Sequence, residues 1–239
     1  MVRQGLPYPI IAVLVSALLA AISDLAGAML FLKSRFRSIQ TRYAVGFASG
    51  ILVSAAFLEL IPEADVSRNA LIILLGFFAF YLVEKAIMLH SCGEAECEAH
   101  TVDWIAIVGM ASDNIVDGIG IAIGYATNPS LGLVITLAVI AHEIPQGFTT
   151  AALATRSGFR VSRIIIFLLI AGAMYPIGAA LASLIPANFY TMAIAFVAGD
   201  FIYIGAGDLL GEAHKKFNAR VVISVVLGGL IAVALNFLG

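Results

Sequence analysis

Charged residues are scarce in this sequence. Asp, Glu, Lys and Arg make up 12% of its 239 residues, whereas 62% are hydrophobic and the mean hydropathy is +1.04. Soluble domains carry roughly 25% charged residues. So large an apolar excess excludes a soluble core and predicts a polytopic membrane protein.

Cysteine is also scarce, and no cleavable leader is expected. The two cysteines, Cys92 and Cys97, fall in one short polar loop, so no disulfide framework is expected. The first residues contain a single Arg and lead into an apolar stretch long enough to span a bilayer, which does not match a cleavable signal. We expect the first helix itself to be the targeting signal.

Apolar stretches of membrane-spanning length recur along the chain. A transmembrane helix needs ~20 predominantly apolar residues. Eight candidate spans cover about 9–32, 43–63, 70–89, 103–126, 130–154, 163–184, 187–212 and 219–238. The loops between them are short and leave no room for a separate soluble domain. We therefore expect residues 1–239 to form one all-α domain of eight transmembrane helices.

The basic residues predict the orientation of these helices. With eight spans, Arg3 and Arg68 fall on one side of the membrane and ten Lys or Arg residues on the other. The ten are Lys33, Arg35, Arg37, Arg42, Arg156, Arg160, Arg163, Lys215, Lys216 and Arg220. Because Lys and Arg concentrate in cytoplasmic loops, we expect both termini outside and the loop between the third and fourth spans in the cytoplasm.

The sequence also repeats itself. Residues 47–64 line up with residues 196–213 at an offset of 149, which superposes spans 1 to 3 on spans 6 to 8. Five spans separate each pair, so the two copies are inverted in the membrane around spans 4 and 5. Inverted repeats with a polar site near the midplane are typical of transporters. The alternative is a chance resemblance between Gly-rich and Ala-rich apolar helices.

The fourth and fifth spans each carry a polar motif in apolar surroundings. Residues 113–118 (DNIVDG) and 142–147 (HEIPQG), related by an offset of 29, place polar side chains at positions i, i+1 and i+4. Positions i and i+4 share a helix face. Both motifs are expected near mid-bilayer, where ionisable groups are expensive and usually functional. Gly118 and Gly147 predict close helix approach, and Pro145 predicts a kink that opens a polar path.

The side chains of the two motifs have metal-ligand chemistry. The ligand set is Asp113, Asn114, Asp117, His142, Glu143 and Gln146. Carboxylate, amide and imidazole donors suit borderline or hard divalent ions such as Zn²⁺, Fe²⁺, Mn²⁺, Co²⁺ or Cd²⁺. The absence of a thiolate from the set argues against tight storage of a soft metal. The alternative is a buried hydrogen-bonded cluster that holds no ion.

Four further acids belong to the outer repeat. Asp208 in the seventh span aligns with Glu59 in the second, and either is a candidate accessory ligand or ion-path residue, with Asp208 favoured. Glu63 and Glu212 end their helices and are expected at two openings.

Two further acids lie within spans, Asp24 in the first and Asp200 in the seventh. They either line an entrance or cap a kinked turn. The residue pattern leaves both interpretations open.

A polar loop follows the third span. It holds His90, Cys92, Cys97 and His100 together with three Glu residues. Such soft or borderline ligands in a cytoplasmic loop are candidates for receiving or sensing a metal. Their spacing matches no structural zinc motif, so a polar loop without metal contact is the alternative.

The two motifs resemble those of the ZIP (Zrt-, Irt-like protein) family of divalent metal transporters. The likeness covers the whole chain, from the eight helices to the ligand-rich loop after the third. Family members typically read His-Asn-x-x-Asp/Glu-Gly on the fourth helix, matched here by Asn114, Asp117 and Gly118. They read His-Glu-x-Pro followed by Gln, Glu or His on the fifth helix, matched here by residues 142–146.

The resemblance implies a binuclear metal centre and metal uptake into the cytoplasm, in a protein that often dimerises. One site would use Asp113, Asp117, His142 and Gln146, and the other Asn114, Asp117, Glu143, Gln146 and Asp208. Asp113 stands where His is usual, which hardens the first site and predicts a tilt towards Fe²⁺ or Mn²⁺. Gln146 is neutral where many relatives carry a carboxylate, so a weaker second site or a single-ion mechanism is the alternative.

We therefore expect a multi-pass protein of the plasma or inner membrane that moves Zn²⁺, with Fe²⁺, Mn²⁺ and Cd²⁺ as further substrates. Alternating access would let one repeat bundle rock against the other. The metal is substrate, and no catalytic cofactor is expected. The expected partners are divalent ions, the lipid bilayer and a second copy of the chain, and no nucleic acid.

Three alternative functions are considered. An intramembrane zinc protease needs a second His four residues after His142; this chain has Gln146 there, so we expect no enzyme. A carrier for another solute would use the acids as proton relays. A metal sensor or channel is the third rival, and a channel would show linear rather than saturable flux.

Overall fold

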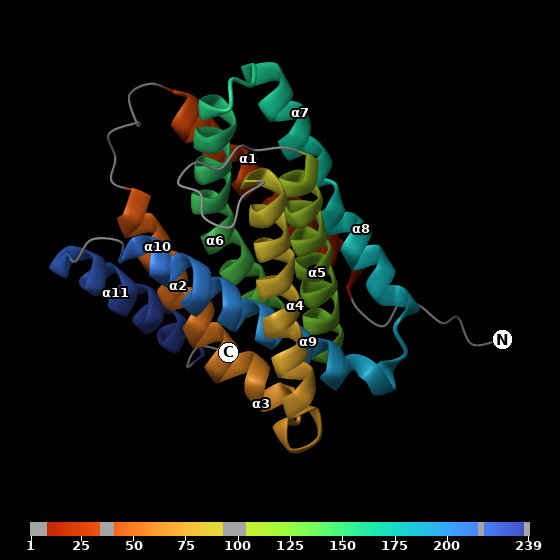
Figure 1. The fold of residues 1–239 in the computed structure, drawn as a ribbon. Helices are drawn as coiled ribbons and strands as arrows, with labels where there is room; N and C mark the ends of the chain where they lie inside the picture. Colours follow the sequence, from red (N-terminus) through yellow and green to blue (C-terminus); the bar gives the residue numbers. More distant parts are fainter. Residues whose placement is uncertain (1–8, 34–40, 93–103, 215–217, 237–239) are drawn as a thin grey trace.

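The computed structural model describes residues 9–33, 41–92, 104–214 and 218–236, and over these ranges its regular structure is helical (Figure 1). The helices of the first half are α1 (Ile10–Leu32), α2 (Thr41–Ala55), η2 (Ala56–Leu60), α3 (Ile61–Glu63), α4 (Val66–Cys92), α5 (Trp104–Thr127) and α6 (Pro129–Arg156). Those of the second half are α7 (Val161–Gly172), α8 (Met174–Leu181), η3 (Ala182–Leu184), η4 (Ala187–Phe189), α9 (Tyr190–Ile202), η5 (Tyr203–Leu209), α10 (Leu210–Ala213) and α11 (Ala219–Asn236). Consecutive short helices join end to end, so the helical stretches fall at the predicted spans.

The outer surface of the helices is apolar. Among the described residues, six stretches are long and apolar enough to cross a membrane: Ile10–Leu32, Arg42–Glu63, Val66–Ala86, Pro129–Ala152, Val161–Leu184 and Ala187–Leu209. Large side chains such as Ile11 on α1, Leu71 and Leu82 on α4, and Leu230 on α11 point outward, with Ile11 80% exposed. Soluble monomers rarely expose continuous apolar faces of this kind. The chain is an all-helical polytopic membrane protein.

The helices pack in two groups. Helix α1 lies along α6 and α5 lies along α8, so that α1, α5, α6, α7 and α8 form the first group (Figure 1). Helix α2 lies along α11 and α4 along α9, which with η5 and α10 form the second group. Each group thus contains helices from both copies of the repeat. The packed groups therefore do not coincide with the two copies of the repeat, and the rocking motion expected from the sequence stays a prediction.

Glycines set the closest helix approaches in the first group. At each of four positions an added Cβ would overlap a backbone carbonyl: Gly27 that of Ile144, Gly147 that of Asp24, Gly178 that of Ile115, and Gly118 that of Tyr175. The first two contacts join α1 to α6, and the last two join α8 to α5. Gly27 and Gly178 are 151 residues apart, as are Asp24 and Tyr175. The two helix pairs therefore repeat one packing, with Asp24 and Tyr175 in equivalent places.

The second group shows the repeat in the same way. An added Cβ on Gly50 would overlap the carbonyl of Val225, and one on Gly199, 149 residues later, would overlap that of Ile73. Both copies also contain a π-helical segment, η2 and η5, at matching places. Such segments are rare and frequent at functional sites. The repeat read from the sequence is thus present in the packing of both helix groups, although α1 corresponds to α8 at an offset of 151 rather than 149.

Candidate metal centre

The two polar motifs meet where α5 and α6 pack side by side. Asp113 and Asp117 lie one turn apart on α5, and His142 and Glu143 are adjacent on α6. Helix α6 continues without interruption through Pro145, which lies inside its bounds. The predicted kink therefore does not break the helix, and the motif keeps the helical spacing that aims its side chains at α5.

Four side chains converge at this contact. Asp113, Asp117, His142 and Glu143 each offer one ligand atom, and these atoms all lie within 4.8 Å of one another. The Nε2 atom of His142 is 3.0 Å from Glu143 Oε1 and 3.3 Å from Asp117 Oδ2. Asp113 is 7% exposed and the other three are fully buried. We call these four residues the central cluster.

The imidazole of His142 is held in the orientation that a metal ligand needs. Its Nδ1 lies 3.1 Å from the carbonyl of Ala138, to which an Nδ1–H would donate. That tautomer leaves a lone pair on Nε2, which faces the carboxylates and forms no hydrogen bond within the described residues. Metal-binding His residues commonly use a carbonyl in this way to fix the ring.

The two amide side chains of the motifs have different roles. Asn114 is fully buried, and its Nδ2 donates to the carbonyl of Ala171 at 2.9 Å, which ties α5 to α7. Its Oδ1 has no hydrogen-bond partner in the described part of the chain and is a candidate ligand. Gln146 is half-buried, and its Nε2 lies 3.3 Å from Asp113 Oδ2, where it orients that carboxylate.

The negative charges of the carboxylates in the central cluster have few compensating partners among the described residues. Asp113 Oδ1 and both oxygens of Asp117 and Glu143 have no hydrogen-bond partner among the described residues. Over the same ranges the only basic side chain within 4.0 Å of them is the imidazole of His142, which is charged only when protonated, and no Lys or Arg pairs with them. Burying an unpaired carboxylate costs several kcal/mol. A divalent cation supplies the missing charge, and the donor set fits one chemically.

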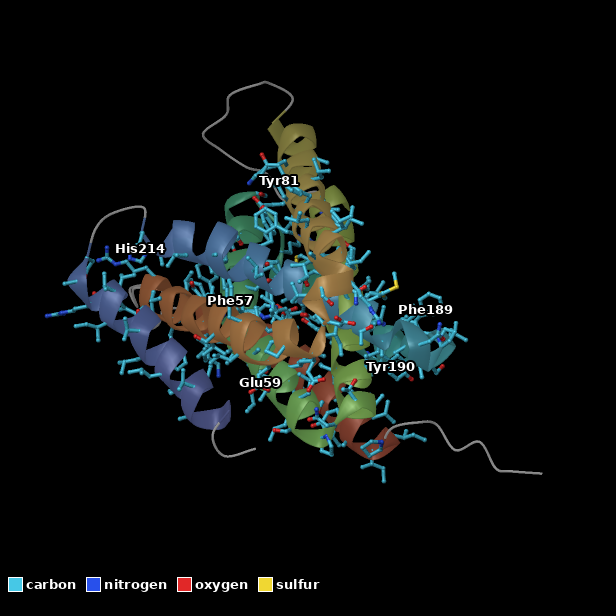
Figure 2. The ribbon with its side chains drawn as sticks, turned by 90° about the horizontal axis from the view of Figure 1, so that it is seen from below. Phe57, Glu59, Tyr81, Phe189, Tyr190 and His214 are labelled. Carbon is cyan, nitrogen blue, oxygen red and sulfur yellow. The ribbon has the colours of Figure 1, made fainter. Side chains whose placement is uncertain are left out.

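The accessory acids predicted from the repeat lie elsewhere. Asp208 is exposed on η5, where it is an electrostatic neighbour of Tyr203 with Glu84, and the structure does not bring it into the central cluster. Glu59 is half-buried on η2, beside the exposed Phe57 in Figure 2, and is not part of the cluster either.

The remaining predicted residues fall at the periphery or outside the description. Glu63 is exposed at the end of α3. Glu212 lies in α10, and His90 and Cys92 lie in α4, but their side chains are outside the described structure. Cys97 and His100 lie outside the described residues, so metal contact by the loop stays a prediction.

Three buried polar residues from other helices are electrostatic neighbours of the cluster. Asp24 on α1, Asp200 on α9 and Tyr175 on α8 are fully buried, and their side-chain oxygens have no hydrogen-bond partner within the described ranges. Sequence reasoning left the two acids open and missed the tyrosine. The sequence did contain a signal for the tyrosine. Asp24 stands three residues before Gly27, and Tyr175 stands three residues before Gly178, so the two residues hold matching places in the repeat.

The two ends of the α5–α6 contact differ in polarity. Towards the loop that joins α5 to α6, fully buried apolar residues close the bundle: Ile121, Ala122, Ile123, Leu131, Ile135, Ala138 and Val139. Towards the opposite end, Ser112, Gln146 and Thr150 are half-buried. Access to the cluster is therefore easier from the end where α5 begins and α6 ends.

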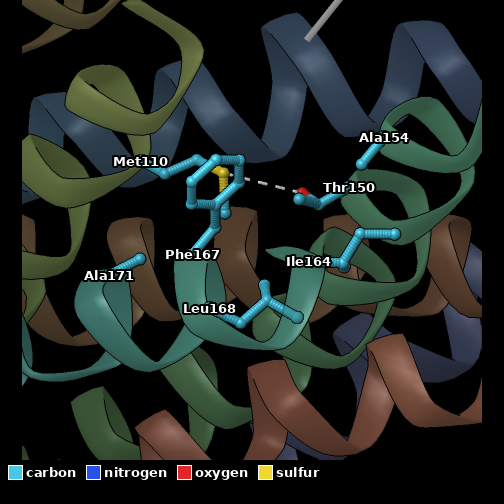
Figure 3. Close-up of a pocket in the computed structure, with 7 residues that line it drawn as sticks. All are labelled: Met110, Thr150, Ala154, Ile164, Phe167, Leu168 and Ala171. Atoms are coloured by element: carbon cyan, nitrogen blue, oxygen red, sulfur yellow. Dashed lines mark hydrogen bonds between the residues drawn. The ribbon is translucent and has the colours of Figure 1, made fainter. Parts of the chain in front are cut away.

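A pocket lies at that more accessible end (Figure 3). Its lining residues come from α5, α6 and α7: Met110, Thr150, Ala154, Ile164, Phe167, Leu168 and Ala171. The hydroxyl of Thr150 is 3.7 Å from Met110 Sδ. Met110 precedes Asp113 by three residues, and Ala171 is the residue whose carbonyl holds Asn114. The pocket thus adjoins the cluster within one helical turn.

Known proteins share this sequence pattern. The ZIP zinc transporter family model matches residues 89–236. Zinc transporter ZIP13 of Pongo abelii is 24% identical over 229 residues, which cover 85% of this chain and 69% of that protein. Zinc transporter YKE4 of Saccharomyces cerevisiae is 25% identical over 213 residues, which cover 73% of this chain and 62% of that protein. Zinc transporter ZIP10 of Mus musculus is 29% identical over 114 residues, 46% of this chain and 14% of that protein. With the family model matched over more than half of its length, this chain belongs to the ZIP zinc transporter family.

Proposed function

We propose that this chain carries divalent transition-metal cations across a membrane through the central cluster. The observation that carries the proposal is the convergence of four buried ligand atoms, all within 4.8 Å of one another, inside a helix bundle with an apolar outer surface. Ionisable groups placed in such surroundings mark ion pathways. Asn114 Oδ1 and Gln146 complete the proposed donor set.

Zinc is the first substrate that the donor set supports. One imidazole with three carboxylates is a borderline to hard combination, which binds Zn²⁺ and also suits Fe²⁺, Mn²⁺ and Cd²⁺. The relatives are named zinc transporters, which supports zinc as a substrate. The metal is cargo in this proposal, and the chain belongs to a family of transporters rather than of enzymes.

The proposed direction is into the cytoplasm. The basic residues predict that the end of the bundle where α5 begins faces the cytoplasm. The half-buried polar residues lie at that end, whereas the opposite end is closed by apolar side chains. The described conformation then corresponds to a site that exchanges ions with the cytoplasmic side.

Uptake of radiolabelled zinc into proteoliposomes tests the proposal. We expect uptake that saturates with zinc concentration and that unlabelled Zn²⁺, Cd²⁺, Fe²⁺ and Mn²⁺ suppress, whereas Mg²⁺ at the same concentration does not. Liposomes without protein are the control. Uptake equal to that control would sink the proposal and favour a carrier for another solute, and linear uptake would indicate a channel.

The residue at position 113 is expected to influence which metal is preferred. Asp113→His replaces a hard oxygen donor in the cluster by a borderline nitrogen donor, so zinc should gain over Mn²⁺ by about tenfold, or about 1.4 kcal/mol. The ratio of zinc to manganese uptake, measured in one proteoliposome preparation, checks this expectation. An unchanged ratio would show that Asp113 does not set preference.

A further inference from the structure

Two buried acids outside the motifs flank the central cluster. Asp24 lies within α1 and Asp200 within α9, and both are fully buried. All four of their carboxylate oxygens have no hydrogen-bond partner in the described part of the chain. Neither acid belongs to the paired motifs on α5 and α6.

Asp24 approaches the cluster from the side of Glu143. A Cβ added to Gly147, one turn after Glu143, would lie 2.6 Å from Asp24 Oδ1, so the carboxylate rests against the α6 backbone. Its electrostatic neighbours are Glu143, His142 and Asp113. The glycine is what lets a short Asp side chain on α1 reach this depth in the contact.

Asp200 approaches from the second helix group. Its electrostatic neighbours are Asp113, Asp117 and His142. The next residue, Phe201, packs edge-on to the imidazole of His142 with ring centroids 6.2 Å apart. Asp24 and Asp200 thus face the same cluster from different helices, α1 in the first group and α9 in the second.

A structural role does not explain either carboxylate. A cap or turn would use the side-chain oxygens as hydrogen-bond acceptors, and within the described ranges none of them accepts. Helix α1 runs without interruption through Asp24, and Asp200 lies two residues inside the end of α9. The alternative of a capped, kinked turn therefore has no supporting contact.

The charge of the site requires more than one compensating group. Adding Asp24 and Asp200 to Asp113, Asp117 and Glu143 gives five buried carboxylates, none of which pairs with a Lys or Arg within the described ranges. A single divalent cation offsets two of the five charges. Unpaired charge at this depth is costly, so the flanking acids need either bound protons or further cations close by.

We propose that Asp24 and Asp200 are cation ligands, one supplied by each helix group, that extend the metal site beyond its two motifs. Asp24 binds on the Glu143 side and Asp200 on the Asp113 and Asp117 side. The added oxygen donors favour harder divalent ions such as Mn²⁺ relative to a site made of the motifs alone. A bound cation then joins the two helix groups. This inference rests on the proposed function.

Metal binding to the purified full-length chain tests the inference. The variants are Asp24→Asn and Asp200→Asn, which keep the side-chain shape, with Asp65→Asn on the exposed turn before α4 as the matched control. Equilibrium dialysis with radiolabelled Zn²⁺ and Mn²⁺ gives Kd, and thermal unfolding with and without metal gives the stabilisation. We expect Kd to rise ~10-fold or more in each site variant, more for Mn²⁺ than for Zn²⁺, because even residues that only support a ligand change affinity by 10–100-fold.

The unfolding temperature separates a ligand from a structural residue. Removing an uncompensated charge should leave the metal-free unfolding temperature equal or higher, while the rise that metal produces shrinks, since ligand stabilisation follows affinity. A lower metal-free temperature with wild-type Kd would overturn the inference and assign a structural role. Asp24→Ser and Asp200→Ser give the same readouts if an Asn variant does not fold. If the wild-type chain binds metal and Asp117→Asn does not, wild-type Kd in the flanking variants refutes this inference alone.

Discussion

Replacing Asp117 by Asn is expected to abolish saturable zinc uptake. Asp117 is fully buried, lies 3.3 Å from the Nε2 atom of His142, and belongs to the four residues whose ligand atoms converge. Losing its charge removes a metal ligand while leaving the shape of the side chain. We expect zinc affinity to fall by roughly 100-fold, about 2.7 kcal/mol, in dialysis of the purified chain.

Asp65→Asn is the matched control for this variant. Asp65 is a partly exposed acid that pairs with Arg68 at 3.5 Å and lies far along the chain from the motifs. It has a positive φ of 47°, which Asn tolerates. Uptake by the control should match the wild type. Wild-type uptake by Asp117→Asn in the same assay would remove the central cluster from the transport path.

Gly27→Ala is expected to have the largest effect on stability. The added Cβ would overlap the carbonyl, carbonyl carbon and Cα of Ile144, all of them backbone atoms that cannot move aside like a side chain. The α1–α6 contact that carries Asp24 must then separate. Overpacking of this kind costs about 1–3 kcal/mol or more, which should appear as a lower unfolding temperature of the purified chain and as weaker zinc binding.

The repeat supplies a second variant and a control. Gly178 occupies the equivalent place on α8 against Ile115, so Gly178→Ala should destabilise the chain by a similar amount. A Cβ on Gly211 meets no atom within 4 Å, and Gly211→Ala should leave the unfolding temperature unchanged. If all three variants have the same unfolding temperature, close glycine contacts do not set the packing of the first helix group.

Much of this architecture follows from local sequence patterns. Apolar stretches mark the helices because a membrane span must be apolar along its length, and the i, i+4 spacing places Asp113 and Asp117 on one face of α5. The offset of 29 relates the two motifs, and the structure does bring their ligand atoms together. These features depend on helix geometry alone.

Other features depend on tertiary packing, which a local sequence pattern does not predict. Asp208 lies in the π-helical segment η5, where each turn takes an extra residue and the face of a side chain no longer follows the α-helical count. Asp24 reaches the cluster only because Gly147 lets α1 approach α6. Asp200 belongs to the second helix group, so its position depends on how the two groups meet. In sequence, it differs from its apolar repeat counterpart, Ile51.

Anomalous X-ray scattering at the zinc edge, from crystals of the zinc-loaded chain, tests the central claim most directly. The claim is that the buried acids and imidazole between α5 and α6 hold the transported ion. It predicts a zinc peak among Asp113, Asp117, His142 and Glu143, with ligand distances of about 2.0–2.2 Å. Zinc found only at surface sites, with this cluster empty under the same loading, would contradict it.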